Sequence, residues 1–286
     1  MDFRTDLAIE IKESLPRKTS DGIETVAFEK SGVKVTKIKI TNFEGEQAIG
    51  KPCGTYITAE IPNLTKYSCA DESVMAILGS LLSDLLPKDG TVLTVGLGND
   101  NITPDALGPL SCSMILATRH ISGELAKSVG LDSLRPSAVH TPGVLGQTGV
   151  ESAEIIKGIV RQINPAAVIV IDALAARRLS RLGCTVQMSD TGIIPGSGVG
   201  NSRAEISKST LGIPVVSIGV PTVVDAGTLV HGLIGESTPL KKENSNMIIT
   251  PREIDLVIDR AARLVGMAVN KALQPHISAE EILMLL

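Results

Sequence analysis

Residues 166–178, AAVIVIDALAARR, decide the fold, because six apolar residues in a row lead directly to Asp172. A run this apolar is typical of a strand that is buried on both faces of a parallel sheet. A second run, TVLTVGL at 91–97, is followed by a glycine and a turn. From residue 91 onward, strand, loop and helix patterns alternate. The sequence therefore predicts an α/β fold, with a mostly parallel, twisted sheet and helices on both of its faces.

Before residue 91 the pattern is different. Residues 23–40 form two β-rich runs joined by Lys30-Ser31-Gly32, which indicates a hairpin, and residues 56–61 follow as a third strand. We expect these strands to form an antiparallel N-terminal extension of the sheet, and residues 1–20, which are charged, to be flexible. Apolar spacing predicts the remaining strands at 137–140, 185–188 and 213–218, and helices at 70–86, 104–120, 150–163, 173–182, 222–233, 251–272 and 279–286.

Composition excludes several classes of protein. The chain has 286 residues, of which 43% are hydrophobic, so it can bury a large core. Its 27 basic and 31 acidic residues leave a net charge of −4, and this balance argues against a nucleic-acid partner. The four cysteines form no C-x-x-C pair, and there is neither a secretory leader nor a run of 18 apolar residues. We expect a cytoplasmic protein with reduced thiols and no membrane segment.

Two aspartates follow the two apolar strands. Asp105 lies in the turn after residues 91–97, and Asp172 directly ends residues 166–171. Ligands of open α/β sheets bind beyond the carboxyl ends of the strands. Two poorly solvated carboxyl groups in one cleft repel each other, so the pair can hold a single proton and act as acid and base on a water molecule. Either aspartate could instead be an ordinary helix cap, and the spacing does not decide whether the two converge.

Other catalytic and cofactor motifs are absent or incomplete in this sequence. The G-L-G-N at 96–99 lacks the third glycine of a dinucleotide loop, since position 101 is Asn101, and there is no Walker loop or G-x-S-x-G. The four histidines show no paired spacing. We therefore expect no cofactor and no bound metal. The D-T-G at 190–192 predicts a turn after a strand or a supporting role near the cleft.

Several segments resemble one known family, the spore germination endopeptidases. They are GLGN and TPDALGP (96–109), IDALAAR (171–177), SDTGIIPGSGVGN (189–201) and LGIPVVSIGVPTVVDA (211–226), and they stand in the family's order over nearly the whole chain. RTDLAIE at 4–10 is similar to the family's self-processing sequence, and its L-A-I-E resembles the stretch that is cut in the substrates. The resemblance implies an atypical aspartic endopeptidase that degrades small acid-soluble spore proteins during germination.

The same resemblance implies the site and the organisation of the chain. The two essential aspartates match Asp105 and Asp172, and the self-processing cut falls between Asp6 and Leu7. Residues 1–6 would then be a pro-segment, and residues 7–286 a single α/β endopeptidase domain similar to hydrogenase maturation proteases. The family further implies an inactive zymogen, a homotetramer and a location in the spore core.

Two other functions stay open at this point. In the hydrogenase maturation proteases, counterparts of the two acids help to bind a metal ion together with a histidine, although no histidine of this sequence matches that role. A metal-dependent processing protease is therefore one alternative. The other is a non-catalytic binding module whose aspartates are only caps. Chelator sensitivity, or an ion bound between Asp105 and Asp172, would favour the first alternative, and carboxyl groups that lie far apart would favour the second.

Overall fold

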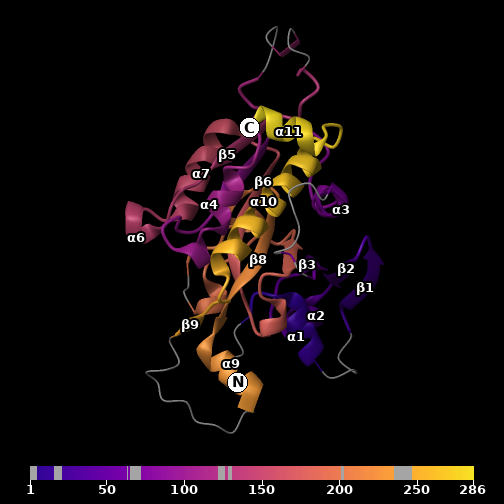
Figure 1. The fold of residues 1–286 in the computed structure, drawn as a ribbon, viewed down its shortest axis with the longest axis vertical. Helices are drawn as coiled ribbons and strands as arrows, with labels where there is room; N and C mark the ends of the chain where they lie inside the picture. Colours follow the sequence, from indigo (N-terminus) through magenta and orange to yellow (C-terminus); the bar gives the residue numbers. More distant parts are fainter. Residues whose placement is uncertain are drawn as a thin grey trace.

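The structure is a computed structural model that describes residues 5–15, 21–62, 64, 72–121, 126–127, 131–200, 203–234 and 247–286. Its described strands belong to one nine-stranded sheet (Figure 1). They are β1 (Ile23–Lys30), β2 (Val33–Ile40), β3 (Gly54–Glu60), β4 (Val92–Gly96), β5 (Ser137–His140), β6 (Ala167–Ala176), β7 (Thr185–Ser189), β8 (Val215–Asp225) and β9 (Ile248–Ile249). The α-helices are α1 (Ala8–Ser14), α2 (Phe43–Ile49), α3 (Glu72–Ser83), α4 (Leu107–Cys112), α6 (Leu145–Thr148), α7 (Ser152–Ile163), α8 (Lys208–Leu211), α9 (Ala226–Ile234), α10 (Ile254–Leu273) and α11 (Ala279–Leu285).

The order of the strands confirms the predicted α/β sheet. It runs β1-β2-β3-β7-β8-β6-β4-β5, with β9 paired to β8. The central strands β8, β6, β4 and β5 are parallel to their neighbours within that group. The hairpin β1–β2 and strand β3 extend the sheet in antiparallel fashion, as the N-terminal pattern predicts, and β7 joins this extension to β8.

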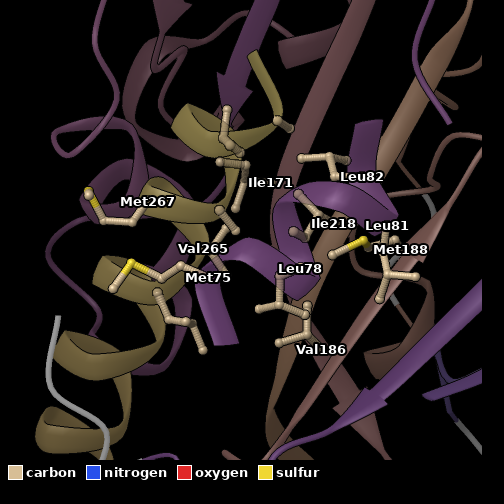
Figure 2. Close-up of a cluster of buried hydrophobic side chains, with 14 of the residues drawn as sticks. Met75, Leu78, Leu81, Leu82, Ile171, Val186, Met188, Ile218, Val265 and Met267 are labelled. Atoms are coloured by element: carbon tan, nitrogen blue, oxygen red, sulfur yellow. The ribbon is translucent and has the colours of Figure 1, made fainter. Parts of the chain in front are cut away.

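Helices cover both faces of the sheet. Successive side chains of a strand point to opposite faces, so a strand that is apolar throughout needs packing partners on both sides. On β6, Ile169 and Ile171 pack in the larger hydrophobic cluster, to which α3 and α10 contribute. Figure 2 shows α3 side chains such as Leu78 and α10 side chains such as Val265 in this cluster. The intervening residues Val168 and Val170 face the other way, into a cluster with α7, and further along β6 Leu174 packs with α1.

The predicted helix at 173–182 is wrong. Strand β6 continues to Ala176, and its pairing with β8 persists, through one register shift, as far as Ala176 and Val224. Only a single 3₁₀ turn, η3 (Leu179–Arg181), follows. Strand β8 likewise runs to Asp225, so α9 begins at Ala226 rather than at the predicted residue 222. In both places the partner strand satisfies the backbone groups that a helix would otherwise have paired internally.

Two other predictions need correction. The helix expected at 104–120 is a 3₁₀ turn, η2 (Thr103–Asp105), followed by α4, which ends at Cys112. Part of the segment expected to be flexible, residues 1–20, forms α1, and Leu7 before it is fully buried. Residues 1–4 and 16–20 lie outside the described residues. Among the described residues, the helices are all too short or too polar to span a bilayer.

Candidate active site

Asp172 lies within β6, at the level where the neighbouring strand β4 stops. The pairing of β4 with β6 ends at Gly96 and Ile171, and the Leu97 N–H donates to the Ile171 carbonyl. Asp172 is therefore not at the end of its own strand, as the sequence suggested, but it does lie beside the carboxyl end of β4. It shares the sheet face of Val170 and Leu174, and it is only 6% exposed. A strand position also excludes the helix-cap reading.

Asp105 is the last residue of η2, in the loop that returns from β4. Its Oδ2 accepts a hydrogen bond from the Asn99 N–H at 2.8 Å. Gly98 makes this return possible: its φ is +115°, and a Cβ there would lie 1.9 Å from the Asp105 carbonyl oxygen. The N-cap of α4 is Ala106, and no side chain caps that helix. Asp105 is thus not a cap of α4 but a carboxyl group tied to the loop after β4.

The two aspartates converge on one cleft of about 480 Å³, and Asp6 lines it with them. Burial raises the pKa of Asp172 well above its usual value, and the charges of Asp105 and Asp6 raise that pKa further. The Ala173 N–H, which donates to Asp172 Oδ1, acts in the opposite direction. Burial also raises the pKa of Asp105, against the hydrogen bond from Asn99. The cleft therefore favours an aspartate pair that keeps a shared proton to higher pH than two solvent-exposed aspartates would.

The predicted processing site is held against β6. The Asp6 N–H donates to the Ala175 carbonyl at 2.9 Å, and the Ala175 N–H donates to Asp6 Oδ2 at 2.8 Å. Asp6 Oδ1 accepts from the Ser197 hydroxyl at 2.9 Å. Leu7 is fully buried in the cluster that contains Leu174. The structure thus brings Asp6, Asp105 and Asp172 together.

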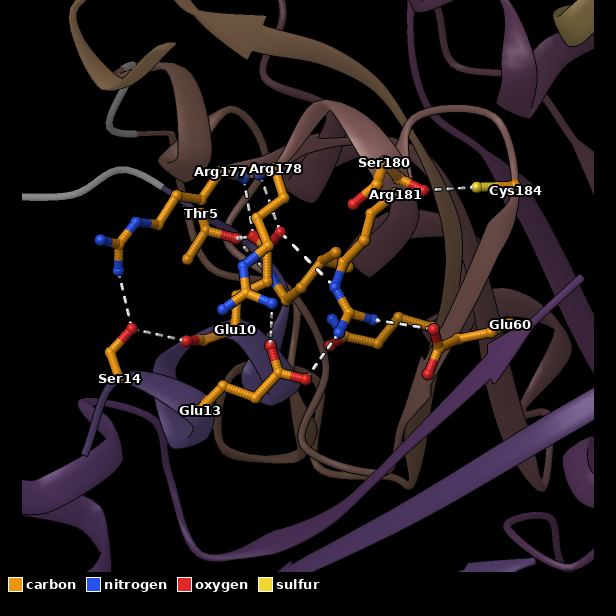
Figure 3. Close-up of polar contacts among 12 residues, drawn as sticks. Thr5, Glu10, Glu13, Ser14, Glu60, Arg177, Arg178, Ser180, Arg181 and Cys184 are labelled. Carbon is orange, nitrogen blue, oxygen red and sulfur yellow. Dashed lines mark hydrogen bonds and ion pairs between the residues drawn. The ribbon is translucent and has the colours of Figure 1, made fainter. Parts of the chain in front are cut away.

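Glu10 fastens α1 next to this segment (Figure 3). Its carboxylate is 1% exposed and accepts the backbone N–H groups of Arg177 at 2.6 Å and Arg178 at 2.9 Å. The Thr5 hydroxyl donates to the same carboxylate, and Arg181 lies 3.7 Å away as an ion-pair partner. These contacts secure the chain on the C-terminal side of Leu7, so the position of the Asp6–Leu7 peptide is restrained from both sides.

The donor set of the cleft does not fit a metal ion with a histidine ligand. None of the described residues that line the cleft is a histidine or a cysteine. Within the same described part of the chain, no three His, Cys, Asp or Glu side chains are grouped closely enough to hold a metal ion. We therefore derive no step through a metal.

Sequence reasoning missed two residues of the site. Gln187 on β7 contacts the Asp6–Leu7 segment, and the only signal was a polar residue at a buried strand position. Glu10 carried no signal, because its partners follow β6, more than 160 positions later. The D-T-G forms a bend after β7, in which Asp190 Oδ1 accepts from the Thr55 N–H, and Thr191 and Gly192 line an adjoining pocket.

Comparison with known proteins identifies the family. A family model described as "Germination protease" matches residues 4–237. Germination proteases of Caldanaerobacter subterraneus and Clostridium tetani are 43% and 39% identical to this chain, in alignments that cover 99% of it and 98% of each relative. The germination protease of Bacillus pumilus is 36% identical over 97% of this chain and 95% of its own.

A solved structure is also similar, though weakly. The [NiFe] hydrogenase maturation protease HycI of Thermococcus kodakarensis matches 66% of this chain and 98% of its own, with 18% identity and a TM-score of 0.38. That superposition is too weak to carry an argument about fold or chemistry. The family model and the near full-length relatives are sufficient by themselves, and they show that the chain belongs to the germination protease family of peptidases.

Proposed function

We propose that this chain is an aspartic-type endopeptidase, made as a zymogen that cuts itself between Asp6 and Leu7. In its processed form it hydrolyses small acid-soluble spore proteins during germination. One observation carries the proposal: Asp105, Asp172 and Asp6 line the same cleft, where burial and mutual repulsion raise the pKa of Asp172. Residues 1–6 are then the pro-segment, and residues 7–286 form the enzyme.

The geometry supports a division of roles within the pair. Asp172 is the more deeply buried carboxyl group, and two neighbouring acids oppose its ionisation, so it holds the shared proton. Asp105 is only half-buried, so its charged form is better solvated than that of Asp172, and it is the base. Asp105 removes a proton from water, and the resulting hydroxide adds to the carbonyl carbon of Asp6.

The second half of the reaction uses the proton on Asp172. That proton goes to the leaving nitrogen of Leu7 as the bond between the two residues breaks, which leaves a carboxyl group on Asp6 and an amine on Leu7. The pair finishes with one proton, now on Asp105, so it is ready for another turnover after that proton exchanges. No serine, cysteine or metal enters any step.

The substrate follows from the segment that the cleft holds. The chain's own L-A-I-E after the cut resembles the stretch that is cut in the small acid-soluble spore proteins, and the names of the relatives place them in germination. The homotetramer and the location in the spore core belong to the same proposal and rest on the family resemblance. Light scattering on the purified full-length chain tests the tetramer.

Single asparagine replacements test the catalytic pair. In purified full-length Asp105→Asn and Asp172→Asn variants, loss of residues 1–6 is followed by mass spectrometry, and cleavage of a small acid-soluble spore protein by gel electrophoresis. Removing a general acid or base costs about 10²- to 10⁴-fold, and we expect losses in this range. Asp100→Asn is the matched control, because Asp100 lies in the same loop but is exposed. Near-normal processing by either variant that folds would reject the mechanism.

A further inference from the structure

Gln187 on β7 contacts the Asp6–Leu7 peptide and the Leu7–Ala8 peptide that follows it. Its Nε2 donates to the Asp6 carbonyl oxygen at 2.8 Å, and its Oε1 accepts from the Ala8 N–H at 2.8 Å. These two contacts fix which end of the amide is nitrogen, since a carbonyl only accepts and an N–H only donates. The side chain is 8% exposed. It lines a pocket of about 340 Å³ that shares Asp6 and Leu174 with the aspartate cleft.

The sheet places Gln187 and Asp172 in one row. Gly219 on β8 pairs with Gln187 on one side and with Asp172 on the other. Residues directly opposite on neighbouring strands point to the same face, so both side chains rise from the sheet on the side of α1. With strands about 4.8 Å apart, their Cα atoms are separated by roughly 10 Å. Gly219 contributes no side chain between them, and the Leu174 side chain lies over it, since a Cβ on Gly219 would be 2.7 Å from Leu174 Cγ.

We propose that Gln187 is a further catalytic residue, whose Nε2–H group binds the carbonyl oxygen of the residue before the cut and stabilises the negative charge that develops there. The proposal rests on the proposed cut between Asp6 and Leu7. Its Nε2 already lies 2.8 Å from the oxygen of the uncut peptide, the atom that becomes the oxyanion. Asp172 lies at the other end of this row, so Gln187 and Asp172 stand on opposite sides of Gly219.

The chemistry of one turnover agrees with this role. When hydroxide adds to the Asp6 carbonyl carbon, the π electrons move to the oxygen, which becomes an alkoxide held by Nε2. When the bond to the Leu7 nitrogen breaks, that electron pair returns and the carbonyl re-forms as part of a carboxyl group.

The test compares self-processing rates of full-length variants. Gln187→Met keeps the size of the side chain but removes the donor, and we expect the first-order rate of loss of residues 1–6 to fall about 10²- to 10³-fold. Ser197→Ala removes a hydrogen bond to the Asp6 side chain without touching the carbonyl, and we expect less than a 10-fold change. Gln274→Met is the matched control for buried amides: Gln274 also bonds a backbone N–H and a backbone C=O, those of Arg135.

Docking of the segment is measured separately. In an Asp172→Asn background, in which we expect cutting to be about 10²- to 10⁴-fold slower, hydrogen exchange of the peptide covering residues 5–15 reports whether Gln187→Met releases the segment. Protection retained together with a slow rate supports the proposal. A rate within threefold of the wild type, or a rate that falls only in proportion to lost protection, overturns it. If Asp105→Asn and Asp172→Asn process normally, the proposed function fails instead, so the two failures are distinguishable.

Discussion

Replacing Glu10 with glutamine tests how strongly α1 is held against the sheet. The carboxylate accepts two backbone N–H groups, at 2.6 and 2.9 Å, and it is 1% exposed. An amide keeps one acceptor, so one bond to a charged group is lost, which costs about 1.5 to 3 kcal/mol. The NH₂ group of the new glutamine also faces a backbone N–H, which loses its acceptor. In addition Arg181, which is 6% exposed, loses one of its anionic neighbours.

We therefore expect Glu10→Gln to lower the free energy of unfolding by about 3 kcal/mol. Because the chain has no tryptophan, urea unfolding is followed by far-UV circular dichroism, and the free energy is obtained by linear extrapolation. Self-processing should slow in the same variant at temperatures where it is folded, since the Asp6–Leu7 peptide loses its restraint on the α1 side.

Glu13→Gln is the matched control on the same helix. Glu13 pairs with Arg178 at 2.9 Å and with Arg181 at 2.7 Å, but its side chain is 33% exposed (Figure 3). Solvent screens such pairs, so we expect a loss of about 1 kcal/mol or less. If Glu10→Gln costs no more than Glu13→Gln, the buried carboxylate does not anchor α1, and the reasoning from its backbone contacts is wrong.

Three further predictions concern the cleft. A carboxyl group whose pKa is raised in the folded state binds its proton more tightly when folded, so stability falls as pH rises from its unfolded pKa, near 3.8, toward the raised folded pKa. Asp172→Asn should therefore raise the Tm relative to the wild type at pH 7, and this gain should shrink at pH 4; an equal shift at both pH values would contradict it. Self-processing should accelerate as pH falls from 8 to 5, because more molecules hold the shared proton, and a flat rate over that range would count against the pair. Gly98→Ala should slow processing at least 100-fold by pushing Asp105 out of place, whereas Gly146→Ala, where a Cβ meets open space, should leave the rate unchanged.

Much of the fold could be predicted from the sequence because its signals are local. An apolar run such as residues 167–171 requires burial on both faces wherever it lies, so the parallel centre of the sheet follows from it. The two β-rich runs within residues 23–40, joined by Lys30-Ser31-Gly32, likewise predict the hairpin, whose observed strands are Ile23–Lys30 and Val33–Ile40. Asp105 and Asp172 could be selected as a pair because each follows such a strand.

Three features could be seen only in the tertiary structure, because the residues that interact there are far apart in the sequence. Residues 173–176 have a helical composition, yet they are strand, since β8 supplies hydrogen-bond partners that local sequence cannot show. From the sequence Glu10 would be expected on the surface, but in the structure its carboxylate accepts the backbone N–H groups of residues 177 and 178. Gln187 and Asp172 share a row only because β8 lies between their strands. A residue's own neighbours in sequence set its local conformation, but the electrostatics and contacts of this cleft depend on segments up to 191 positions apart.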